Sequence, residues 1–323
     1  MQQELEQRIF NVSTEHEFAQ IALEIFQFQY SNIPVYRNYV DQLGKSVPKT
    51  LHEIPFLPIS FFKTHQVIAP EMEVQRLFKS SGTGGNRSQH FVTDESLYQC
   101  AFNQGYDKLI GNPGEQIILA LLPNYLEQGE SSLIYMVDHL IKRTDNSLSG
   151  FVLNDLGKLI ERYKEANDQG KQVVIFGVSY ALLDLCELTP DLSNAIIIET
   201  GGMKGRRKEL TKSELHATLK QGLNCSSIYS EYGMTELLSQ GYSKIDGVFE
   251  LNRTMKILIR EVNDPFSYAA LNKTGGVNVI DLANLYSCSF IETQDLGKIT
   301  DKGFEILGRF DNSDIRGCNL LVE

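Results

Sequence analysis

The sequence predicts an α/β fold, with a mainly parallel sheet, helices on both of its faces and a small β-rich unit after it. Short apolar runs alternate with amphipathic helical segments over residues 116–229, and this alternation indicates crossovers between parallel strands. From residue 247 the apolar runs are short and turn residues separate them, which indicates β structure without further crossovers. We expect one structural domain in three segments: an N-terminal helical and extended arm (1–75), an α/β core (76–246), and a β-rich closing unit with the C-terminal tail (247–323).

The N-terminal arm is expected to contain one clear helix. Thr14 and Glu17 form a capping box, and apolar residues at helical spacing follow it. Over residues 31–75 prolines interrupt any long element. Residues 54–63 are too apolar for a solvated loop, so we expect them to pack across the main domain as an extended arm.

The core and the closing unit contain the runs that predict individual elements. Buried strands are expected at 116–122, 172–176, 195–198 and 227–229, because these runs are short and apolar. Apolar residues at helical spacing predict helices at 156–163, 180–188 and 213–219. Strand-like runs in the closing unit occupy 255–262, 276–281, 288–292 and 304–307.

Composition excludes several classes of protein. The chain has 323 residues, of which 42% are apolar and 22% charged, as in ordinary globular proteins. A net charge of −11 argues against a nucleic-acid-binding face. The five cysteines are odd in number and form no CxxC pair, which favours reduced thiols. We expect no signal peptide and no membrane span, and therefore a cytoplasmic protein.

A glycine-rich stretch lies at the start of the core. Residues 80–87 read SSGTGGNR, and an apolar run begins at Phe91. Glycines let a backbone approach a ligand closely, and successive N–H groups with Ser and Thr hydroxyls form an anion-binding nest. Arg87 adds a planar guanidinium that suits phosphate. The stretch is not a Walker A loop, because no Gly-Lys-Ser/Thr follows at the required spacing, and an ordinary polar hairpin turn is the alternative.

Two later stretches offer groups that could bind the rest of a nucleotide. In YGMTE (232–236), an exposed aromatic ring can stack on a base, Thr235 can donate to a phosphate and Glu236 can hold a magnesium ion. In TQDLG (293–297) and GRFD (308–311), Asp295 can accept hydrogen bonds from ribose hydroxyls and Arg309 can reach the same sugar. Each stretch alone is also explained as a turn or a solvated charge.

Taken together, these motifs resemble the three nucleotide motifs of adenylate-forming enzymes, the superfamily of acyl-CoA synthetases, luciferases and peptide-synthetase adenylation domains. The sequence is more closely similar to LuxE-type acyl-protein synthetases, the long-chain-fatty-acid ligases of bacterial fatty-acid reductase systems. The segments IPFLPISFFKTH (54–65), FKSSGT (78–83) and ETGGMK (199–204) resemble that family's signatures. The resemblance extends from about residue 50 to the C-terminus.

The resemblance implies a role for each matching position. The residues that would wrap the ATP phosphates are Ser80, Ser81, Gly82, Thr83, Gly84, Gly85, Asn86 and Arg87. Tyr232, with Gly233 beside it, would stack on adenine, and Gly201 and Gly202 would line the base. Thr235 would bind the α-phosphate, Glu236 would hold Mg²⁺, and Asp295 with Arg309 would bind ribose. The wall at Gly177, Val178 and Ser179 would face the carboxylate substrate.

The sequence departs from the superfamily's pattern in two places. Gly84 stands where threonine is usual, and Asn86-Arg87 replaces Pro-Lys, although arginine still supplies a positive charge. Typical members continue into a mobile C-terminal subdomain with a catalytic lysine. We expect that subdomain to be lacking, because the sequence ends at Glu323. LuxE-type proteins resemble this chain in being short, and in that family a cysteine near the C-terminus receives the acyl group.

Cys318 is the candidate acyl acceptor. It follows Arg316-Gly317 near the end of the sequence, where a tail can reach a bound acyl-adenylate. Arg316 could favour the thiolate, which is the nucleophilic form. The alternative is a small buried apolar residue. The remaining cysteines fall within helical or strand-like runs and are expected to be structural: Cys100, Cys186, Cys225 and Cys288.

Two other functions compete with a ligase. Residues 174–181 are predicted to form a strand, a G-x-S-x-A turn and a helix, which imitates the nucleophile elbow of an α/β-hydrolase with Ser179 as nucleophile. Such an enzyme needs a later acid and histidine, and His216 is the only histidine that follows. A non-catalytic nucleotide- or acyl-binding protein is the second competitor, because the lysine-bearing subdomain has no counterpart. The histidines show no zinc-ligand spacing.

The sequence therefore predicts ATP- and Mg²⁺-dependent activation of a carboxylic acid, with a fatty acid as the expected substrate. The acyl-adenylate would pass its acyl group to a thiol, on Cys318 or on a partner. The partner classes implied are an acyl-CoA reductase, an acyltransferase or an acyl carrier protein.

Overall fold

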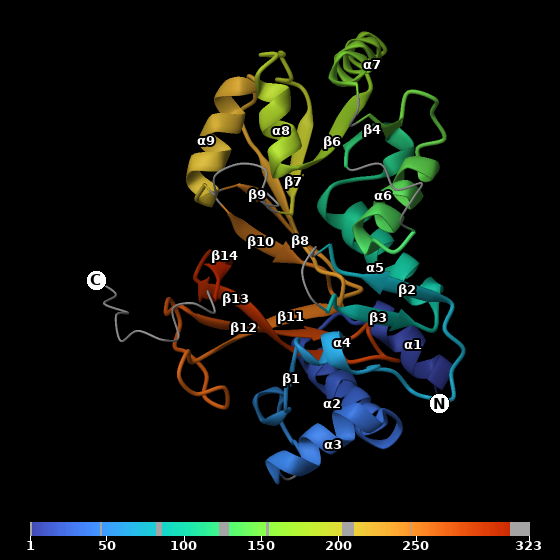
Figure 1. Ribbon diagram of the computed structural model, residues 1–323, viewed down its shortest axis with the longest axis vertical. Coiled ribbons are helices and arrows are strands. Elements are labelled where there is room, and N and C mark those ends of the chain that lie inside the picture. The colour runs from blue at the N-terminus through green and yellow to red at the C-terminus, as the bar shows by residue number, and fades with distance from the viewer. Residues whose placement is uncertain are drawn as a thin grey trace.

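The computed structural model describes residues 2–45, 47–81, 86–122, 129–152, 155–201, 210–245 and 247–310, and it confirms the α/β fold (Figure 1). The helices are α1 (Gln2–Asn11), α2 (Glu15–Asn32), α3 (Pro34–Leu43), α4 (Phe61–Thr64), α5 (Glu95–Leu109), α6 (Ser132–Arg143), α7 (Leu156–Asp168), α8 (Ser179–Cys186) and α9 (Lys212–Gly222), with 3-10 turns η1 (Leu51–Glu53) and η2 (Pro113–Glu115). The strands are β1 (Leu57–Pro58), β2 (Arg76–Lys79), β3 (Gln89–Val92), β4 (Gln116–Leu121), β5 (Gly150–Phe151), β6 (Gln172–Val178), β7 (Ile196–Thr200), β8 (Tyr229–Tyr232), β9 (Gly241–Ile245), β10 (Val248–Leu251), β11 (Met255–Arg260), β12 (Gly275–Asp281), β13 (Phe290–Thr300) and β14 (Gly303–Arg309).

The parallel part of the sheet lies where the sequence predicts it. Strands β5, β4, β6, β7 and β8 lie side by side in this order and run parallel. Every residue of β4 is buried, and so is all of β6 after its first residue, because helices cover both faces. Figure 1 shows α8 and α9 to one side of these strands and α5 and α6 to the other.

The β-rich closing unit continues the same sheet. Beyond β8 the order is β9, β10, β14, β13, β12 and β11, with antiparallel pairing throughout. The connection between β10 and β14 consists of two residue pairs, Val248 with Glu305 and Phe249 with Phe304. The sheet as a whole is therefore mixed, since its antiparallel part adds to the parallel part that the crossovers predict.

The N-terminal arm is more helical than the sequence analysis expects. The capping box at Thr14 and Glu17 starts α2 as predicted, but α3 begins at Pro34, within the region expected to be irregular. Proline suits the first turn of a helix, where its missing N–H would have no intrahelical partner. Gly44, with φ of 61°, ends α3 in the left-handed conformation.

The apolar segment 54–63 does pack across the sheet. Leu57 and Pro58 form β1, which pairs in parallel with Ile291 and Glu292 of β13. The Ile59 N–H donates to the Glu292 carbonyl at 2.9 Å. Leu57 is fully buried, which explains why the segment is too apolar for a solvated loop. The arm therefore joins the antiparallel end of the sheet, beside α2 and α3 (Figure 1).

Candidate functional site

A cavity of about 1080 Å³ lies at the carboxyl ends of β6, β7 and β8. The last residues of these strands, Val178, Thr200 and Tyr232, all line it. Further walls come from the β2–β3 hairpin, the N-terminus of α6, and β13 and β14. In parallel α/β sheets, ligands bind outside the carboxyl ends of the strands. The cavity lies where the parallel and antiparallel parts of the sheet meet.

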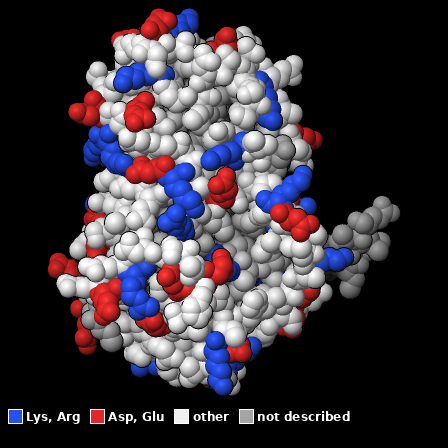
Figure 2. Space-filling model, turned by 180° about the vertical axis from the view of Figure 1, so that it is seen from behind, with Lys and Arg blue, Asp and Glu red and all other residues white. Residues whose placement is uncertain are grey.

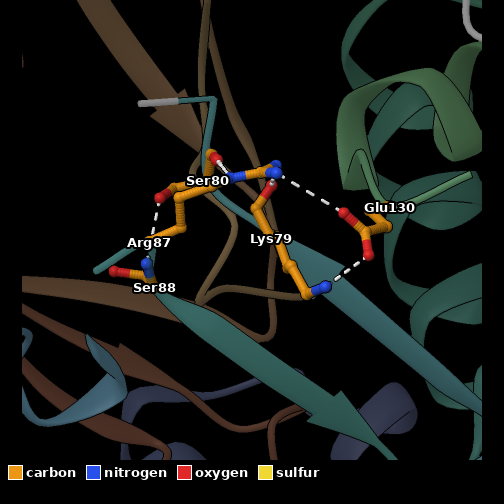
Figure 3. A network of polar contacts seen from close by, with 5 residues as sticks. All are labelled: Lys79, Ser80, Arg87, Ser88 and Glu130. Atoms are coloured by element: carbon orange, nitrogen blue, oxygen red, sulfur yellow. Dashed lines mark hydrogen bonds and ion pairs between the residues drawn. The ribbon is translucent and has the colours of Figure 1, made fainter. Parts of the chain in front are cut away.

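The glycine-rich stretch connects β2 to β3, and hydrogen bonds join its described ends (Figure 3). The Ser80 N–H donates to the Ser88 carbonyl at 3.1 Å, and the Ser88 N–H donates to Ser80 Oγ at 3.0 Å. The Arg87 guanidinium donates to the Ser80 carbonyl. Arg87 and Lys79 both pair with the carboxylate of Glu130. The Glu130 carboxylate therefore pairs with both cationic side chains at the ends of the glycine-rich stretch.

Tyr232, Asp295 and Arg309 form a connected group on the opposite wall. The Tyr232 hydroxyl donates to Asp295 Oδ2 at 3.0 Å, and Arg309 Nε donates to Asp295 Oδ1 at 3.0 Å. Asp295 and Arg309 face each other across β13 and β14. Tyr232 is 7% exposed, so the ring is more buried than the sequence analysis expects. It packs edge-on against Phe249 and Phe304, which fixes its position.

The loop after β8 carries Thr235 and Glu236. His90 of β3 contacts the Thr235 carbonyl through Nδ1 at 2.8 Å and Asn284 Oδ1 through Nε2 at 3.0 Å. Asn284 Nδ2 in turn donates to the Glu236 carbonyl at 2.8 Å. Thr235 lines the cavity, whereas Glu236 is 4% exposed and lies behind it. Burial raises the pKa of Glu236, and hydrogen bonding with Ser88 partly offsets this.

A buried polar cluster lies at the carboxyl end of β7. Glu199 Oε1 is 3.1 Å from Lys212 Nζ and 3.5 Å from His216 Nε2. Burial alone would raise the pKa of Glu199, but His216, Lys212 and Ser230 outweigh it and lower that pKa to about 2. Glu199 is therefore ionised at neutral pH, and it fixes Lys212 on the cavity wall.

Glu231 is a second acid on this wall, with its pKa displaced in the other direction. The Thr200 hydroxyl donates to Glu231 Oε2 at 2.5 Å. Burial and the neighbouring charge of Glu199 raise the pKa of Glu231 to about 7, despite Thr200 and Lys212. A methyl group at Gly233 would lie 2.3 Å from Glu231 Oε1. A side chain at position 233 would therefore require the Glu231 carboxyl to move from its present place.

Part of the cavity wall is apolar. Leu133, Ile134 and Met136 of α6 line it together with Val178 and Tyr98. Tyr98 is 2% exposed, and its hydroxyl donates to the Ser132 carbonyl at 2.9 Å. The cavity thus combines a charged region with an apolar region, a combination typical of sites for small organic ligands.

The structure brings many of the sequence-predicted positions to this cavity. Those that line it are Ser81, Arg87, Val178, Gly201, Tyr232, Gly233, Thr235, Asp295 and Arg309. Those that lie beside it without lining it are Ser80, Asn86, Gly177, Ser179 and Glu236. Gly82, Thr83, Gly84, Gly85, Gly202 and Cys318 lie outside the described residues.

Several lining residues were not singled out from the sequence. Lys79, Glu130, Lys212, Glu231 and Gln240 all contribute to the wall. Lys79 lies within the FKSSGT segment (78–83) and Glu231 directly precedes YGMTE, so the sequence does carry a signal for these two residues. Glu130 and Lys212 have no such signal, because only the tertiary fold places them at the cavity.

The described residues do not form the catalytic triad that the hydrolase alternative requires. Ser179 is 2% exposed, and its hydroxyl donates to the Gly201 carbonyl at 2.8 Å. Within the described residues, His216 contacts Ser230 and Glu199 through the same Nε2 atom. A catalytic triad needs the base on the nucleophile and the acid on the other ring nitrogen. Ser179 is therefore a structural residue at the start of α8.

Glu236 is the carboxylate that the family resemblance implies for Mg²⁺, although it is buried behind the cavity wall and does not line the cavity. No cluster of three or more His, Cys, Asp or Glu side chains occurs in the parts of the chain that the structure describes. Mg²⁺ is commonly held by one or two carboxylates, water and substrate phosphates. Glu236, next to the cavity-lining Thr235, suits that mode of binding as the single protein carboxylate.

The outer surface gives two further observations. On the face shown in Figure 2, Lys and Arg side chains are interspersed with Asp and Glu, without a continuous basic surface. Among the described residues, none of the helices has the length and apolar character needed to cross a bilayer. Cys100 is exposed on α5, contrary to the expectation for the cysteines within regular elements, whereas Cys225 and Cys288 are buried.

Comparison with solved structures identifies the fold of the chain. MatB from Rhodopseudomonas palustris bound to ATP shares 17% identity and a TM-score of 0.55, over 73% of this chain and 48% of MatB. 2-Hydroxyisobutyryl-CoA ligase, in complex with 2-HIB-AMP and CoA, shares 12% identity and a TM-score of 0.67, over 93% of this chain and 69% of the ligase. The luciferase-like enzyme of the mealworm Zophobas morio gives 15% identity and a TM-score of 0.52, over 74% and 58%. The chain thus has the fold of adenylate-forming enzymes and spans about half the length of MatB.

Comparison of the sequence assigns the family. No protein of curated function matches the chain. The sequence model of the acyl-protein synthetase family LuxE, however, matches residues 5–323, which is nearly the whole chain. The chain therefore belongs to the LuxE family of acyl-protein synthetases.

Proposed function

We propose that this protein uses ATP to convert a carboxylic acid into an acyl-adenylate and then transfers the acyl group to a thiol. The observation that carries the proposal is the connected group of Tyr232, Asp295 and Arg309, in the same cavity as the cations of the β2–β3 hairpin. One end of the cavity offers hydrogen-bond acceptors and an aromatic ring, as a nucleoside requires. The hairpin offers positive charge, as a triphosphate requires.

In this proposal, the nucleoside lies at the Asp295 wall. The Asp295 carboxylate would accept hydrogen bonds from the ribose hydroxyls, and Arg309 would contact the same sugar. Tyr232 would stack on adenine, with Gly201 and Gly202 along the base. The hydrogen bond from Tyr232 to Asp295, at 3.0 Å, would hold the adenine-binding ring and the ribose-binding carboxylate in fixed relative positions.

The phosphates would lie along the glycine-rich turn. Residues 80–87 would supply N–H and hydroxyl donors, and Arg87 and Lys79 would supply positive charge. Thr235 would donate to the α-phosphate. Glu236 would hold Mg²⁺, which would neutralise charge on the phosphoryl oxygens.

The proposed first step joins the acid to AMP. A carboxylate oxygen attacks the α-phosphorus, a new P–O bond forms, and the bond to the bridging oxygen breaks, so that pyrophosphate leaves. Negative charge shifts onto phosphoryl oxygens during this step. Arg87, Lys79 and the Thr235 hydroxyl would stabilise that charge without reorganising.

The proposed second step transfers the acyl group. A thiolate attacks the acyl carbonyl, a thioester forms and AMP leaves. The acceptor would be Cys318 or a thiol on a partner such as an acyl-CoA reductase, an acyltransferase or an acyl carrier protein. The acid would lie against the apolar wall that contains Val178, and a long-chain fatty acid remains the predicted substrate.

Acid-dependent exchange of pyrophosphate into ATP tests the first step. We expect exchange with at least one member of a panel of aliphatic and aromatic acids. In Asp295→Asn, the KM for ATP should rise about 10- to 100-fold, because a charged hydrogen bond contributes about 1.5–3 kcal/mol. Asp301→Asn, in the exposed β13–β14 turn, is the matched control and should leave the KM unchanged. ATP binding without exchange for any acid would favour the non-catalytic alternative.

Acyl labelling tests the acceptor. Incubation with ATP and a radiolabelled acid should leave label on the protein, and hydroxylamine should release it, as expected of a thioester. Cys318→Ala should lose the label, and Cys100→Ala, which removes an exposed thiol, should keep it. Equal labelling of Cys318→Ala and the parent protein would reject Cys318 as acceptor.

A further inference from the structure

We propose that His90 is a positioning residue of the adenylation site: its imidazole holds the backbone of Thr235, and with it the hydroxyl that would contact the α-phosphate. This inference rests on the proposed function. It assigns a role to a side chain that does not line the cavity and belongs to none of the nucleotide motifs. It follows from the contacts of a buried ring that links four separate parts of the chain.

His90 lies on β3, two residues after Ser88, and is 1% exposed. Its Nδ1 is 2.8 Å from the Thr235 carbonyl oxygen, in the loop after β8, and its Nε2 is 3.0 Å from Asn284 Oδ1, between β12 and β13. The Phe62 ring of α4 packs edge-on against the imidazole, with ring centroids 5.8 Å apart. The ring is therefore fixed in a position in which both nitrogens have a partner.

The partners determine which atoms donate in these hydrogen bonds. The Thr235 carbonyl can only accept, so the proton of this bond belongs to His90 Nδ1. Asn284 Nδ2 donates to the carbonyls of Glu236 and Cys288, both at 2.8 Å, which leaves Oδ1 as the acceptor for Nε2. Burial lowers the pKa of His90, and the two hydrogen bonds act in the opposite direction. The contact geometry thus assigns a donor to each ring nitrogen.

The loop that His90 contacts has little support from the sheet. Residues 233–236 follow the end of β8 and form neither strand nor helix. One backbone hydrogen bond, from the Leu237 N–H to the Met234 carbonyl at 3.1 Å, closes the turn. Thr235 lines the cavity, and its carbonyl accepts from the buried imidazole. The position of its side chain therefore depends on the bond to His90.

His90 also joins the two parts of the proposed phosphate site. Ser88 and His90 are two residues apart on β3, so their side chains leave the same face of the strand. Ser88 hydrogen-bonds with Glu236, and His90 hydrogen-bonds with Thr235. Alternate residues of β3 thus hold successive residues of the loop, and β3 directly follows the glycine-rich stretch. The stretch and the loop would keep a fixed relative position before the nucleotide binds, as electrostatic stabilisation of a transition state requires.

This arrangement should affect the reaction step more than ATP binding. Charge accumulates on the α-phosphoryl oxygens during the displacement, so the position of the Thr235 hydroxyl matters most in the transition state. His90→Leu removes both ring donors. We expect the kcat of acid-dependent pyrophosphate exchange to fall about 10- to 100-fold and the KM for ATP to change by less than about threefold.

Two variants that each keep one donor separate positioning from packing. An asparagine amide places its nitrogen near Nδ1 of the histidine that it replaces, and a glutamine amide reaches the place of Nε2. His90→Asn therefore keeps a donor for Thr235, and His90→Gln keeps one for Asn284. We expect His90→Asn to recover most of the kcat that His90→Leu loses, and His90→Gln to recover little. Thr93→Val removes a buried hydroxyl that has no hydrogen-bond partner in the described part of the chain, and this control should leave kcat unchanged.

Hydrogen exchange of the peptide that contains residues 233–236 measures the hold on the loop without any reaction. In His90→Leu and His90→Gln, these amides should exchange about three- to tenfold faster than in the parent protein, the factor that one hydrogen bond contributes. In His90→Asn they should exchange at the parent rate. Thermal unfolding shows which variants are folded, and the comparison of His90→Asn with His90→Gln decides even where His90→Leu does not fold.

Equal kcat values in His90→Asn and His90→Gln would overturn the inference, because a ring that only fills space favours neither amide. A higher KM for ATP with unchanged kcat would also overturn it. Absence of exchange with every acid in the parent protein would instead reject the proposed function. Hydrogen exchange then decides on His90: loop amides protected in His90→Asn but not in His90→Gln support its positioning role, and equal rates reject it.

Discussion

Glu199 and Glu231 lie at the ends of neighbouring parallel strands, yet their surroundings displace their pKa values in opposite directions. Glu199 is buried, but His216 and Lys212 contact its Oε1 and keep it ionised, with a pKa of about 2. Glu231 is partly buried, and its hydrogen-bond partner is the neutral Thr200 hydroxyl, so its pKa is about 7. The contacts of His216 and Lys212 with Glu199 thus decide which of the two acids carries the charge.

This difference predicts a pH dependence of stability for Glu231. The pKa in the folded protein is about 7, above the ordinary 4.5, so the folded state binds more protons between these values. The free energy of unfolding should therefore fall as pH rises from 4.5 to 7. Relative to the parent protein, Glu231→Gln should gain about 2–3 kcal/mol between pH 5 and 8. Urea unfolding across this range measures the difference, and a constant difference would contradict the assignment.

At the residue scale, the sequence identifies cavity-lining residues that belong to a recognisable motif. It does not identify those that only tertiary contacts bring to the cavity. The YGMTE stretch identifies Tyr232 and Thr235, and both line the cavity. Lys212, in contrast, is held at the cavity wall by its ion pair with Glu199. No pattern in the residues next to Lys212 indicates that contact. The roles of these residues stay predictions until the exchange assays are made.

Among the elements, the β2–β3 hairpin shows how the cavity holds its positive charge. Lys79 and Arg87 belong to the hairpin, and Glu130 immediately precedes the segment that enters α6 (Figure 3). The Lys79 N–H also donates to the Glu130 carbonyl at 2.7 Å. The acid therefore joins the hairpin to the α6 side of the cavity and competes with any anion for the same cations.

Glu130→Gln tests this competition. Loss of the carboxylate should free both cations and tighten ATP binding about three- to tenfold, since partly exposed ion pairs contribute up to about 1 kcal/mol each. Equilibrium binding of ATP at fixed ionic strength measures the effect. Asp138→Asn, which breaks the Asp138–Lys142 pair on the outer side of α6, should have no effect. Weaker binding in Glu130→Gln would mean that the acid positions the cations for the nucleotide.

Elements with a strong local pattern could be predicted from the sequence, and those defined by their partners could not. The apolar run at 116–122 corresponds to β4, and the capping box at Thr14 starts α2. The helix that begins at Pro34 is not predicted, because proline indicates an interruption unless its place in the first turn of a helix is known. β13 continues to Thr300, beyond the run at 288–292, because pairing with β12 and β14 sustains it.

At the scale of the whole molecule, the N-terminal helices are tied to the antiparallel strands through Gln29. This side chain of α2 is fully buried. Its Nε2 donates to the Asn284 carbonyl at 3.0 Å and the Leu285 carbonyl at 2.9 Å, and its Oε1 accepts from the Ser289 N–H at 3.1 Å. One glutamine thus satisfies backbone groups of the turn between β12 and β13, more than 250 residues away.

Replacement of Gln29 should therefore destabilise the entire fold. Gln29→Leu leaves buried carbonyls and an N–H without partners, and we expect it to lower the free energy of unfolding by about 3 kcal/mol. Gln27→Leu, at an exposed position of the same helix, is the control and should change it by less than about 0.5 kcal/mol. Urea denaturation at neutral pH measures both. A small effect in Gln29→Leu would show that the arm contributes little to global stability.

The global topology was only partly predictable. Alternating strands and helices predict β4, β6, β7 and β8 and their parallel direction, whereas the short β5 at Gly150–Phe151 is not predicted. That the closing strands join the same sheet depends on the pairing of β10 with β14. Two residue pairs establish that contact, and no periodicity in either strand specifies its partner.

The close approach of Gly233 to Glu231 also has a consequence for how this sequence can evolve. A side chain at position 233 would meet Glu231 Oε1 at 2.3 Å, although the backbone there does not itself demand glycine. Alanine at position 233 would therefore displace the Glu231 carboxyl from its hydrogen bond with Thr200. In relatives of this protein, a side chain at 233 is accordingly expected to occur more often beside a smaller residue at 231 than beside glutamate.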